Sequence, residues 1–298
     1  MILVRLTGGL GNQMFQYAAA RRLAEAHGTD LKIDTSRLLN SNPLDTPRDY
    51  ALGCFTISAA IASANESLLC EKLHQQARSP LYRLLKKCGL LRAPGEMNYV
   101  RQQGPAFDPA ILLLPDNVCL DGYWQSEKYF PGIRALLKKE FTLRRPLDGE
   151  DRQLAEKIRG CAAVSLHVRR GDYLTNPHAA KHHGTCDRDY YDQAVSFIMR
   201  KIPAAELFIF SDDPHWSAMN MNFDLPTTIV SKTDGTAEGR DLILMSSCRH
   251  HIIANSSFSW WGAWLGDDPE KIVIAPKRWF NDPARFTGDL VPEGWLRF

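Results

Sequence analysis

The sequence lacks any long hydrophobic run. Its apolar stretches all fall short of the about 18–20 consecutive residues that a membrane-spanning helix needs. The first nine residues have no basic leader and only a short apolar run, so they do not resemble a signal peptide. We expect them to form the first strand of a cytoplasmic protein.

The sequence also lacks an excess of charge of either sign. Lys and Arg number 36 against 34 for Asp and Glu, which gives a net charge of +2 and argues against nucleic acid as a partner of the whole chain. Of its 298 residues, 44% are hydrophobic and 23% are charged, as in globular proteins with a sizeable core. This length suits two ordinary domains.

Paired cysteine motifs are absent as well. The cysteines are seven, an odd number, and no two are spaced as C-x-x-C, which argues against a disulfide framework and against structural zinc. We therefore predict reduced thiols at Cys54, Cys70, Cys88, Cys119, Cys161, Cys186 and Cys248.

The C-terminal half alternates short apolar runs with helical patterns. The runs cover residues 162–168, 207–210, 228–230, 251–254 and 272–275, and the helical patterns cover 188–200, 214–219, 237–246 and 257–265. Strands this short and apolar are typical of burial on both faces, so we predict a parallel, doubly wound sheet. Ligands of such sheets lie at the carboxyl ends of the strands.

The N-terminal half begins in the same way and then becomes less regular. We predict strands at residues 2–6, 31–34 and 118–123, helices at 12–27, 66–91 and near 127–139, and a long loop over 36–55. Pro146 and Gly149 interrupt the pattern, so we place a domain boundary near residue 150. Two α/β domains, residues 1–150 and 151–298, would then face each other across a cleft.

One motif, His167-Val-Arg-Arg-Gly-Asp172, begins in a predicted strand and ends in the following loop. Arginines in this position can bind a diphosphate through charge-assisted hydrogen bonds. A solvated basic loop beside a lone buried histidine remains the alternative.

A second motif, Asn255-Ser-Ser-Phe-Ser-Trp-Trp-Gly-Ala-Trp264, follows a strand and enters a helix. Its polar start predicts a helix cap, and a helix N-terminus is a ready phosphate site. The alternative is a plain cap followed by an aromatic core stripe, and we expect Trp260 and Trp264 to be core residues in either case.

A third motif, Gly8-Gly-Leu-Gly-Asn-Gln13, follows the first strand. It resembles the start of a dinucleotide fingerprint, but the third glycine spacing is missing and Asp34 is a weak candidate for binding ribose. A tight, closely packed turn is the simpler interpretation, and Asn12 and Gln13 would then face the cleft.

Two patterns suggest a metal site, and we discount both. Asp187-Arg-Asp189 fits a metal-binding D-x-D pattern, but Asp187 directly precedes a helix and is better explained as its cap. The cluster in the preceding loop matches no standard zinc spacing; it consists of His178, His182, His183 and Cys186.

Residues 78–92 mix leucines with Arg and Lys. A helix of this kind either packs on the domain surface or contacts an anionic membrane peripherally, on its cytoplasmic side.

Taken together, the three motifs resemble the bacterial α-1,2-fucosyltransferase family, glycosyltransferase family 11. The similarity extends to Asp241-Leu-Ile-Leu-Met-Ser246 and Pro276-Lys-Arg-Trp-Phe280 and is weakest over residues 36–115. The resemblance implies a GT-B-like fold of two Rossmann-like domains. It also implies inverting transfer of L-fucose from GDP-β-L-fucose to the 2-hydroxyl of a terminal galactose in an oligosaccharide or glycolipid, without a metal or other cofactor.

The resemblance also assigns roles to individual residues. Arg169 would bind the β-phosphate beside His167 and Arg170, and Asp241 would bind the guanine edge. Asn12 would face the fucose and the acceptor across the cleft. The phosphates would be held by the start of the second motif, at Asn255, Ser256, Ser257 and Phe258.

Three questions stay open at this stage. Asp172 is the nearest carboxylate for the general base that an inverting transfer needs, but a base from the N-terminal half or the leaving phosphate would also serve. The donor would be different in a transferase that uses another nucleotide sugar. A non-catalytic module that binds glycans or nucleotides is the alternative from another class.

Overall fold

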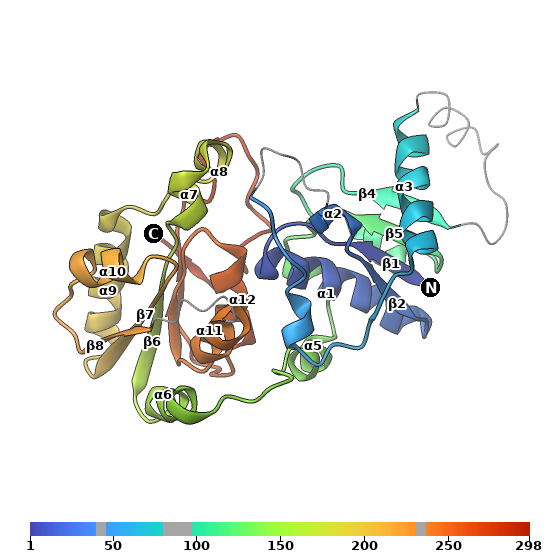
Figure 1. The fold of residues 1–298 in the computed structure, drawn as a ribbon. Helices are drawn as coiled ribbons and strands as arrows, with labels where there is room; N and C mark the ends of the chain where they lie inside the picture. Colours follow the sequence, from blue (N-terminus) through green and yellow to red (C-terminus); the bar gives the residue numbers. More distant parts are fainter. Residues whose placement is uncertain (40–45, 80–96, 231–236) are drawn as a thin grey trace.

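The computed structural model describes residues 1–39, 46–79, 97–230 and 237–298. It contains two parallel β-sheets, one built from each half of the chain, which lie side by side with helices between and around them (Figure 1). This is the predicted α/β class with two Rossmann-like, GT-B-like halves. The boundary predicted near residue 150 stays a prediction.

The N-terminal sheet has the strand order β3-β2-β1-β5-β4, and all its pairings are parallel. Its central strand, with the sequence Ile-Leu-Val-Arg, is buried throughout, as expected for a parallel strand covered on both faces. The strands are β1 (Ile2–Arg5), β2 (Leu31–Asp34), β3 (Ala60–Ile61), β4 (Asn98–Arg101) and β5 (Val118–Asp121).

Helices and short 3-10 turns connect these strands. Helix α3 starts at a capping box, in which Ser63 and Glu66 satisfy each other's backbone N–H groups. The α-helices are α1 (Leu10–His27), α2 (Ser36–Leu39), α3 (Ala64–Arg78) and α5 (Arg134–Glu140), and the 3-10 turns are η1 (Leu52–Cys54), η2 (Pro109–Leu113) and η3 (Glu127–Tyr129).

The C-terminal sheet has the strand order β11-β10-β9-β6-β7-β8, again parallel. Its strands are β6 (Ala162–Val168), β7 (Ala205–Ser211), β8 (Thr227–Val230), β9 (His250–Ile252), β10 (Val273–Ala275) and β11 (Leu296–Arg297). Its helices are α6 (Gly149–Arg159), α7 (Gly171–Thr175), α8 (Pro177–His182), α9 (Arg188–Lys201), α10 (Pro214–Asn220), α11 (Ala237–Ser246) and α12 (Ser257–Leu265).

Helices α1 and α12 pack on each other between the two sheets (Figure 1). Phe15 of α1 contacts the rings of Trp260 and Trp261, with centroids 4.4 and 5.0 Å away. The Trp261 Nε1–H also donates to the Gly11 carbonyl oxygen at 3.0 Å. The two halves therefore share one core, and Trp260 and Trp264 are core residues as predicted.

The prediction of reduced thiols is wrong for two cysteines, because Cys70 and Cys119 form a disulfide. Cys70 lies on α3 and Cys119 on β5, and both are buried in a small cluster with Leu3 and Tyr99. The partners are 49 residues apart in the sequence, so only the packing of α3 on the sheet brings them together. Cys161, Cys186 and Cys248 are free thiols, Cys54 forms no disulfide with a described residue, and Cys88 lies outside the described residues.

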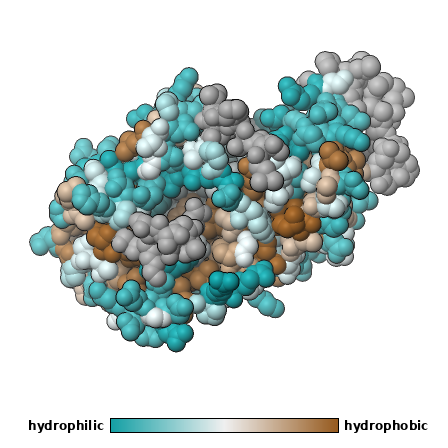
Figure 2. Space-filling model, in the orientation of Figure 1, coloured by the Kyte–Doolittle hydropathy of each residue, from teal (hydrophilic) through white to brown (hydrophobic). Residues whose placement is uncertain are grey.

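Among the described residues, no helix is long and apolar enough to cross a bilayer. On the face that Figure 2 shows, hydrophilic residues form most of the described surface, and apolar residues occur in scattered groups. Helix α3 ends at Arg78. Most of the basic amphipathic segment predicted over 78–92 lies outside the described residues.

Candidate active site

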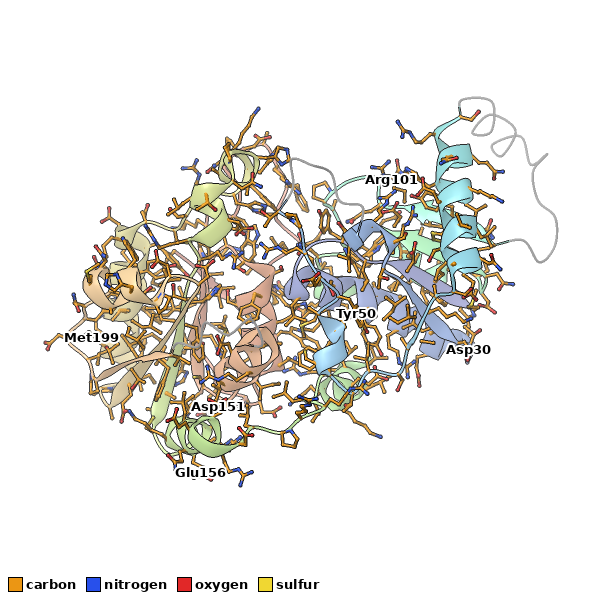
Figure 3. All side chains as sticks on the ribbon, in the orientation of Figure 1. Asp30, Tyr50, Arg101, Asp151, Glu156 and Met199 are labelled. Atoms are coloured by element: carbon orange, nitrogen blue, oxygen red, sulfur yellow. A yellow bond between two sulfur atoms is a disulfide. The ribbon has the colours of Figure 1, made fainter. Side chains whose placement is uncertain are left out.

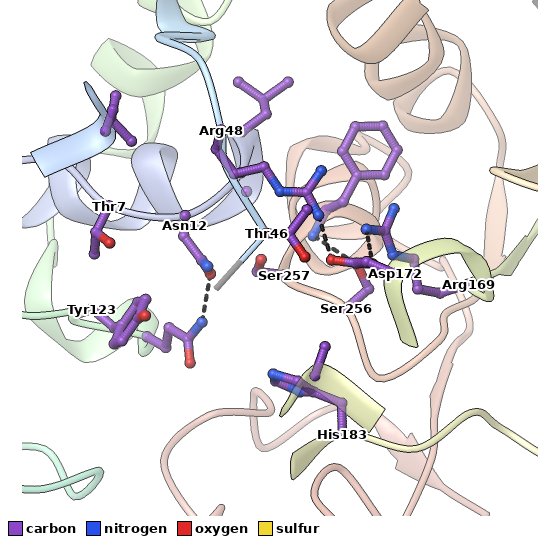
Figure 4. Close-up of a pocket in the computed structure, with 18 of the residues that line it drawn as sticks. Thr7, Asn12, Thr46, Arg48, Tyr123, Arg169, Asp172, His183, Ser256 and Ser257 are labelled. Carbon is purple, nitrogen blue, oxygen red and sulfur yellow. Dashed lines mark hydrogen bonds and ion pairs between the residues drawn. The ribbon is translucent and has the colours of Figure 1, made fainter. Parts of the chain in front are cut away.

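A cleft of about 1470 Å³ lies between the two halves. Its walls come from the loops that follow β1, β2, β5, β6 and β7, and from the N-terminal ends of α1 and α12. It lies at the carboxyl ends of parallel strands in both sheets, where ligands of such folds bind. Figure 4 shows the charged and polar side chains that project into it.

Arg169 follows directly after β6, and carboxylates hold its guanidinium at the cleft wall. Nη1 lies 2.8 Å from Asp212 Oδ2, and Nη2 donates to Asp172 Oδ1 at 2.5 Å. Burial alone would lower the pKa of Arg169, but these carboxylates outweigh it and raise the pKa. The guanidinium is therefore a fixed, permanent cation.

Asp172 lies between two guanidinium groups from different halves of the chain. Arg48, on the segment before η1, forms an ion pair with its second oxygen (Figure 4). Burial would raise the pKa of Asp172, but the charges of Arg169 and Arg48 hold it below its ordinary value. A carboxylate stabilised in this way is a poor proton acceptor, so the geometry favours Asp172 as a positioning group over the base that the sequence suggested.

The predicted donor contact from Arg170 does not agree with the structure. Its guanidinium lies over the Trp216 ring, 3.6 Å from the centroid, and its Nε lies 3.5 Å from Asp213 Oδ2. Arg170 is not among the residues that line the cleft. Adjacent residues point to different sides here, so one arginine faces the ligand space and the other packs behind it.

His167 lines the cleft as predicted, although its side chain is almost fully buried. Burial lowers its pKa to about 4, so the ring is neutral near pH 7. Its Nδ1 has no hydrogen-bond partner within the described part of the chain. A neutral ring nitrogen without a partner is suited to a hydrogen bond with a ligand.

The N-terminus of α12 opens into the cleft. The Ser256 hydroxyl caps the helix by accepting from the Phe258 N–H at 3.3 Å, and Ser257 and Phe258 also line the cleft. Asn255 lines it too, but its Nδ2 donates to the carbonyl oxygens of His183, Gly184 and Trp279. This side chain fixes the surrounding loops, which differs from the predicted phosphate contact.

The N-terminus of α1 meets that of α12. A Cβ atom at Gly11 would lie 2.5 Å from the Phe258 backbone nitrogen, so only glycine permits this approach. Gly8 has a φ of +77°, as the predicted tight turn requires. Two helix N-termini thus contribute partial positive charge to the cleft that Arg169 also lines.

Asn12 lines the cleft, and its Oδ1 accepts from Gln125 Nε2 at 2.7 Å. The prediction that Gln13 faces the cleft is wrong. Gln13 is fully buried, and its Nε2 donates to the carbonyl oxygens of Gly8 and Asp49. Asp34 is also buried and paired with Arg5, so it is not placed to bind ribose.

Asp241, on α11, lines the cleft near the residues of β7. Arg240 donates to its Oδ1 at 2.5 Å and also pairs at 2.7 Å with Asp151 of α6, the residue labelled in Figure 3. The ion pair with Arg240 restricts the orientation of the Asp241 carboxylate.

The suspected metal ligands do not converge. Asp187 caps α9 by accepting from the Tyr190 N–H at 2.8 Å, as predicted. His183 stacks on Tyr173 with ring centroids 4.8 Å apart, whereas the thiol of Cys186 points to Asn255. Within residues 1–39, 46–79, 97–230 and 237–298, no three His, Cys, Asp or Glu side chains are placed to hold a metal ion.

Several cleft residues were not found from the sequence. Some lie in loops without periodicity, and others lie on helix faces that only the tertiary fold brings to the cleft. They are Arg48, Glu71, Tyr123, Gln125, Tyr173 and Arg285. Arg48 is surrounded by Pro, Asp and Thr, which signalled a loop but gave no indication that it reaches Asp172.

Comparison with known proteins shows which family has this sequence and architecture. Residues 58–297 match the family described as Glycosyl transferase family 11. The chain is 32% identical to the O-antigen biosynthesis glycosyltransferase WbnK of Escherichia coli, over 95% of this chain and 97% of the relative. It is also 32% identical to an alpha-1,2-colitosyltransferase of Escherichia coli, over 100% and 98% of the two chains.

More distant similarities point the same way. Over 53% of this chain and 47% of the relative, it is 27% identical to the galactoside alpha-(1,2)-fucosyltransferase 2 of Bos taurus. The fold resembles that of a mutant of Arabidopsis thaliana FUT1 in complex with GDP, with a TM-score of 0.56, 11% identity, and coverage of 98% of this chain and 74% of the other. The chain thus belongs to glycosyltransferase family 11.

Proposed function

We propose that this chain transfers L-fucose from GDP-β-L-fucose to the 2-hydroxyl of a terminal galactose, with inversion at the anomeric carbon. The observation that carries the proposal is the meeting of Arg169 with the N-termini of α1 and α12 in one cleft. A leaving GDP needs such a concentration of positive charge. The names of relatives add support, since one acts as a galactoside alpha-(1,2)-fucosyltransferase.

In the proposed reaction, the bond between fucose C1 and the β-phosphate oxygen breaks while the galactose O2 attacks C1 from the opposite face. GDP leaves with the electron pair of the broken bond, and the proton of the 2-hydroxyl is released to solvent. Negative charge grows on the departing phosphate, and Arg169 stabilises it together with the backbone N–H group of Ser257 at the start of α12. These donors are already in place, so no divalent metal or other cofactor is required in this scheme.

Other cleft residues would have supporting roles. His167 would donate or accept a hydrogen bond at the donor, and Asp241 would bind the guanine edge. Asp172 would hold Arg169 and Arg48 in position, and Asn12 would lie beside the transferred sugar. In this arrangement residues 151–298 bind the donor and residues 1–150 the acceptor, which is an oligosaccharide or glycolipid at the cytoplasmic side of a membrane.

Colitose transfer is the second candidate, because a colitosyltransferase is 32% identical over the full length of this chain. Colitose is fucose without its 3-hydroxyl, so both sugars present the same leaving group to Arg169. Comparing kcat/KM for the GDP derivatives of the two sugars separates the candidates. A preference of tenfold or more for GDP-colitose would overturn the fucose assignment.

The first experiment measures GDP release from GDP-fucose with and without lactose, each with and without EDTA. We expect release that lactose stimulates and EDTA does not change. Loss of activity with EDTA would contradict the metal-free scheme. If lactose does not stimulate release although the protein binds GDP, the galactose assignment fails.

A further inference from the structure

We propose that the loop after β5 forms the acceptor subsite, in which Tyr123 packs against the apolar face of the terminal sugar and Gln125 binds its hydroxyls. This inference rests on the proposed function, since it identifies where the second substrate of that reaction lies. None of these loop residues has a role in the donor chemistry described above.

Tyr123 is unusual among the large aromatic residues of this region because it is exposed. It is 42% exposed and lines the cleft, whereas the neighbouring Trp124 and Tyr129 are buried. Figure 4 places Tyr123 beside Asn12, across the pocket from Arg169 and Asp172. An exposed ring inside a cleft offers an apolar surface to a ligand.

The loop is held in a fixed, strained shape. Gln102 Oε1 accepts from the backbone N–H groups of both Tyr123 and Trp124, at 2.8 and 3.0 Å. Trp124 is fully buried and has a φ of +53°, a conformation that bulky residues rarely adopt. Strain of this kind clusters at ligand sites, where the surrounding structure maintains it. Here it points Trp124 into the core and Tyr123 towards the cleft.

Polar groups for a sugar lie next to the ring. The Gln125 Nε2 donates to Asn12 Oδ1 at 2.7 Å, which orients both amides. Within the described residues, no protein hydrogen bond occupies Gln125 Oε1, so this oxygen can accept from a hydroxyl. An aromatic face with adjacent amides matches a pyranose ring, which has apolar C–H faces and a rim of hydroxyls.

Charge separates this wall from the donor wall. Tyr123, Gln125 and Asn12 carry no formal charge, and the cations Arg169 and Arg48 lie across the pocket around Asp172 (Figure 4). The diphosphate would bind near the cations, and a neutral sugar would bind near the ring. The chemical class that fits the loop is therefore a neutral glycoside.

The test measures two affinities on the intact protein. Saturation-transfer NMR on protein saturated with GDP gives the Kd for lactose, and a calorimetric titration of GDP-free protein gives the Kd for GDP. We expect Tyr123→Ala to raise the Kd for lactose about tenfold, because an aromatic contact contributes about 1.4 kcal/mol. Tyr123→Phe should stay within about threefold of the unaltered protein, because the ring face remains. Neither variant should change the Kd for GDP.

Two further variants sharpen the result. Gln102→Ala should also weaken lactose binding, because the loop loses the oxygen that holds both N–H groups. Phe286→Ala is the matched control, since Phe286 is 48% exposed but does not line the cleft. It should leave both affinities unchanged.

The outcomes distinguish this inference from the proposed function. A Tyr123→Ala protein that binds lactose within twofold of the unaltered protein overturns the subsite, even if the enzyme transfers fucose. An unaltered protein that binds no lactose also overturns it. If lactose binds through Tyr123 but GDP-fucose is not a donor, the subsite stands and the assignment of the donor fails.

Discussion

The two walls of the cleft are built in different ways. The proposed donor wall consists of side chains and helix ends that follow strands directly, such as Arg169 after β6 and Ser256 before α12. The proposed acceptor wall consists of a loop, in which Tyr123 is presented because Gln102 and the buried Trp124 fix the backbone. The donor wall thus depends on the topology of a parallel sheet, whereas the acceptor wall depends on one local conformation.

The most severe way to break the donor wall is Arg169→Ala. We expect kcat to fall by about 10²-fold or more, as for loss of one preorganised charge partner in a transition state. The KM for lactose should change little, because Arg169 lies across the pocket from Tyr123. Steady-state kinetics with both substrates check this. If the protein only binds its ligands, Arg169→Ala should weaken GDP binding modestly, and the unaltered protein should show no turnover.

Gly11→Ala tests whether the two halves of the chain depend on the close contact between the N-termini of α1 and α12. The new Cβ would lie 2.5 Å from backbone atoms of Ser257 and Phe258, which cannot move aside as a flexible side chain would. We expect the free energy of unfolding to fall by about 2 kcal/mol, as for overpacking of a core. Urea denaturation measures this, and Gly28→Ala is a control with no atom within 4 Å but with a strained φ of +58°. If Gly11→Ala leaves the free energy of unfolding unchanged, the N-termini of α1 and α12 can move apart at little cost.

The donor wall was largely predictable from sequence, and the reasons are physical. Residues after a buried strand must emerge at the carboxyl edge, so the strand pattern assigned His167 and Arg169 to the cleft, and the family resemblance added Asp241. The side to which each side chain turns was not predictable. Arg170 and Asn255 follow strands as well, but Arg170 packs on Trp216 and Asn255 holds three loop carbonyls.

The fold class and most C-terminal elements followed from the alternation of apolar runs, because a parallel sheet requires a crossover between strands. The elements of the N-terminal half were harder to predict from the sequence. Strand β3 has only two residues, too few for a period to be recognised. Strand β4, with the sequence Asn-Tyr-Val-Arg, is only partly buried and so lacks the apolar run of a covered strand. The disulfide between Cys70 and Cys119 had no local signal at all.

The ion pair between Arg48 and Asp172 joins the two halves of the chain, and a double-mutant cycle measures that connection. For Arg48→Ala and Asp172→Asn, we expect a coupling of about 1.5 kcal/mol in the free energy of unfolding, because both side chains are partly buried. Chemical denaturation of the two single variants and the double variant provides the value. A coupling near zero would mean that the two halves are held together by the packing of α1 on α12 and not by this ion pair.

The smallest expected effect comes from pH. His167 has a pKa of about 4 in the folded chain because it is buried, below its ordinary value of 6.5. As the pH falls, His167 is protonated in the unfolded chain before it is protonated in the folded chain. The stabilisation of the folded state by the neutral, buried His167 is therefore fully present above about pH 6.5 and is lost as the pH falls towards 4. Between about pH 7 and about pH 5.5 we expect a loss of about 1 kcal/mol. Urea titrations at both values, repeated on His167→Gln, should show a shallower slope in the variant.

The contact between α1 and α12 has a consequence for how such enzymes diversify. Phe15, Phe130 and Phe141 from the first half surround Trp261 from the second, within one aromatic cluster. A hybrid joined near residue 150 from two relatives would have to match this cluster, as well as the glycine at position 11. New pairings of donor and acceptor are therefore expected to arise by changes within surface loops, and recombination of whole halves is expected to give misassembled chains.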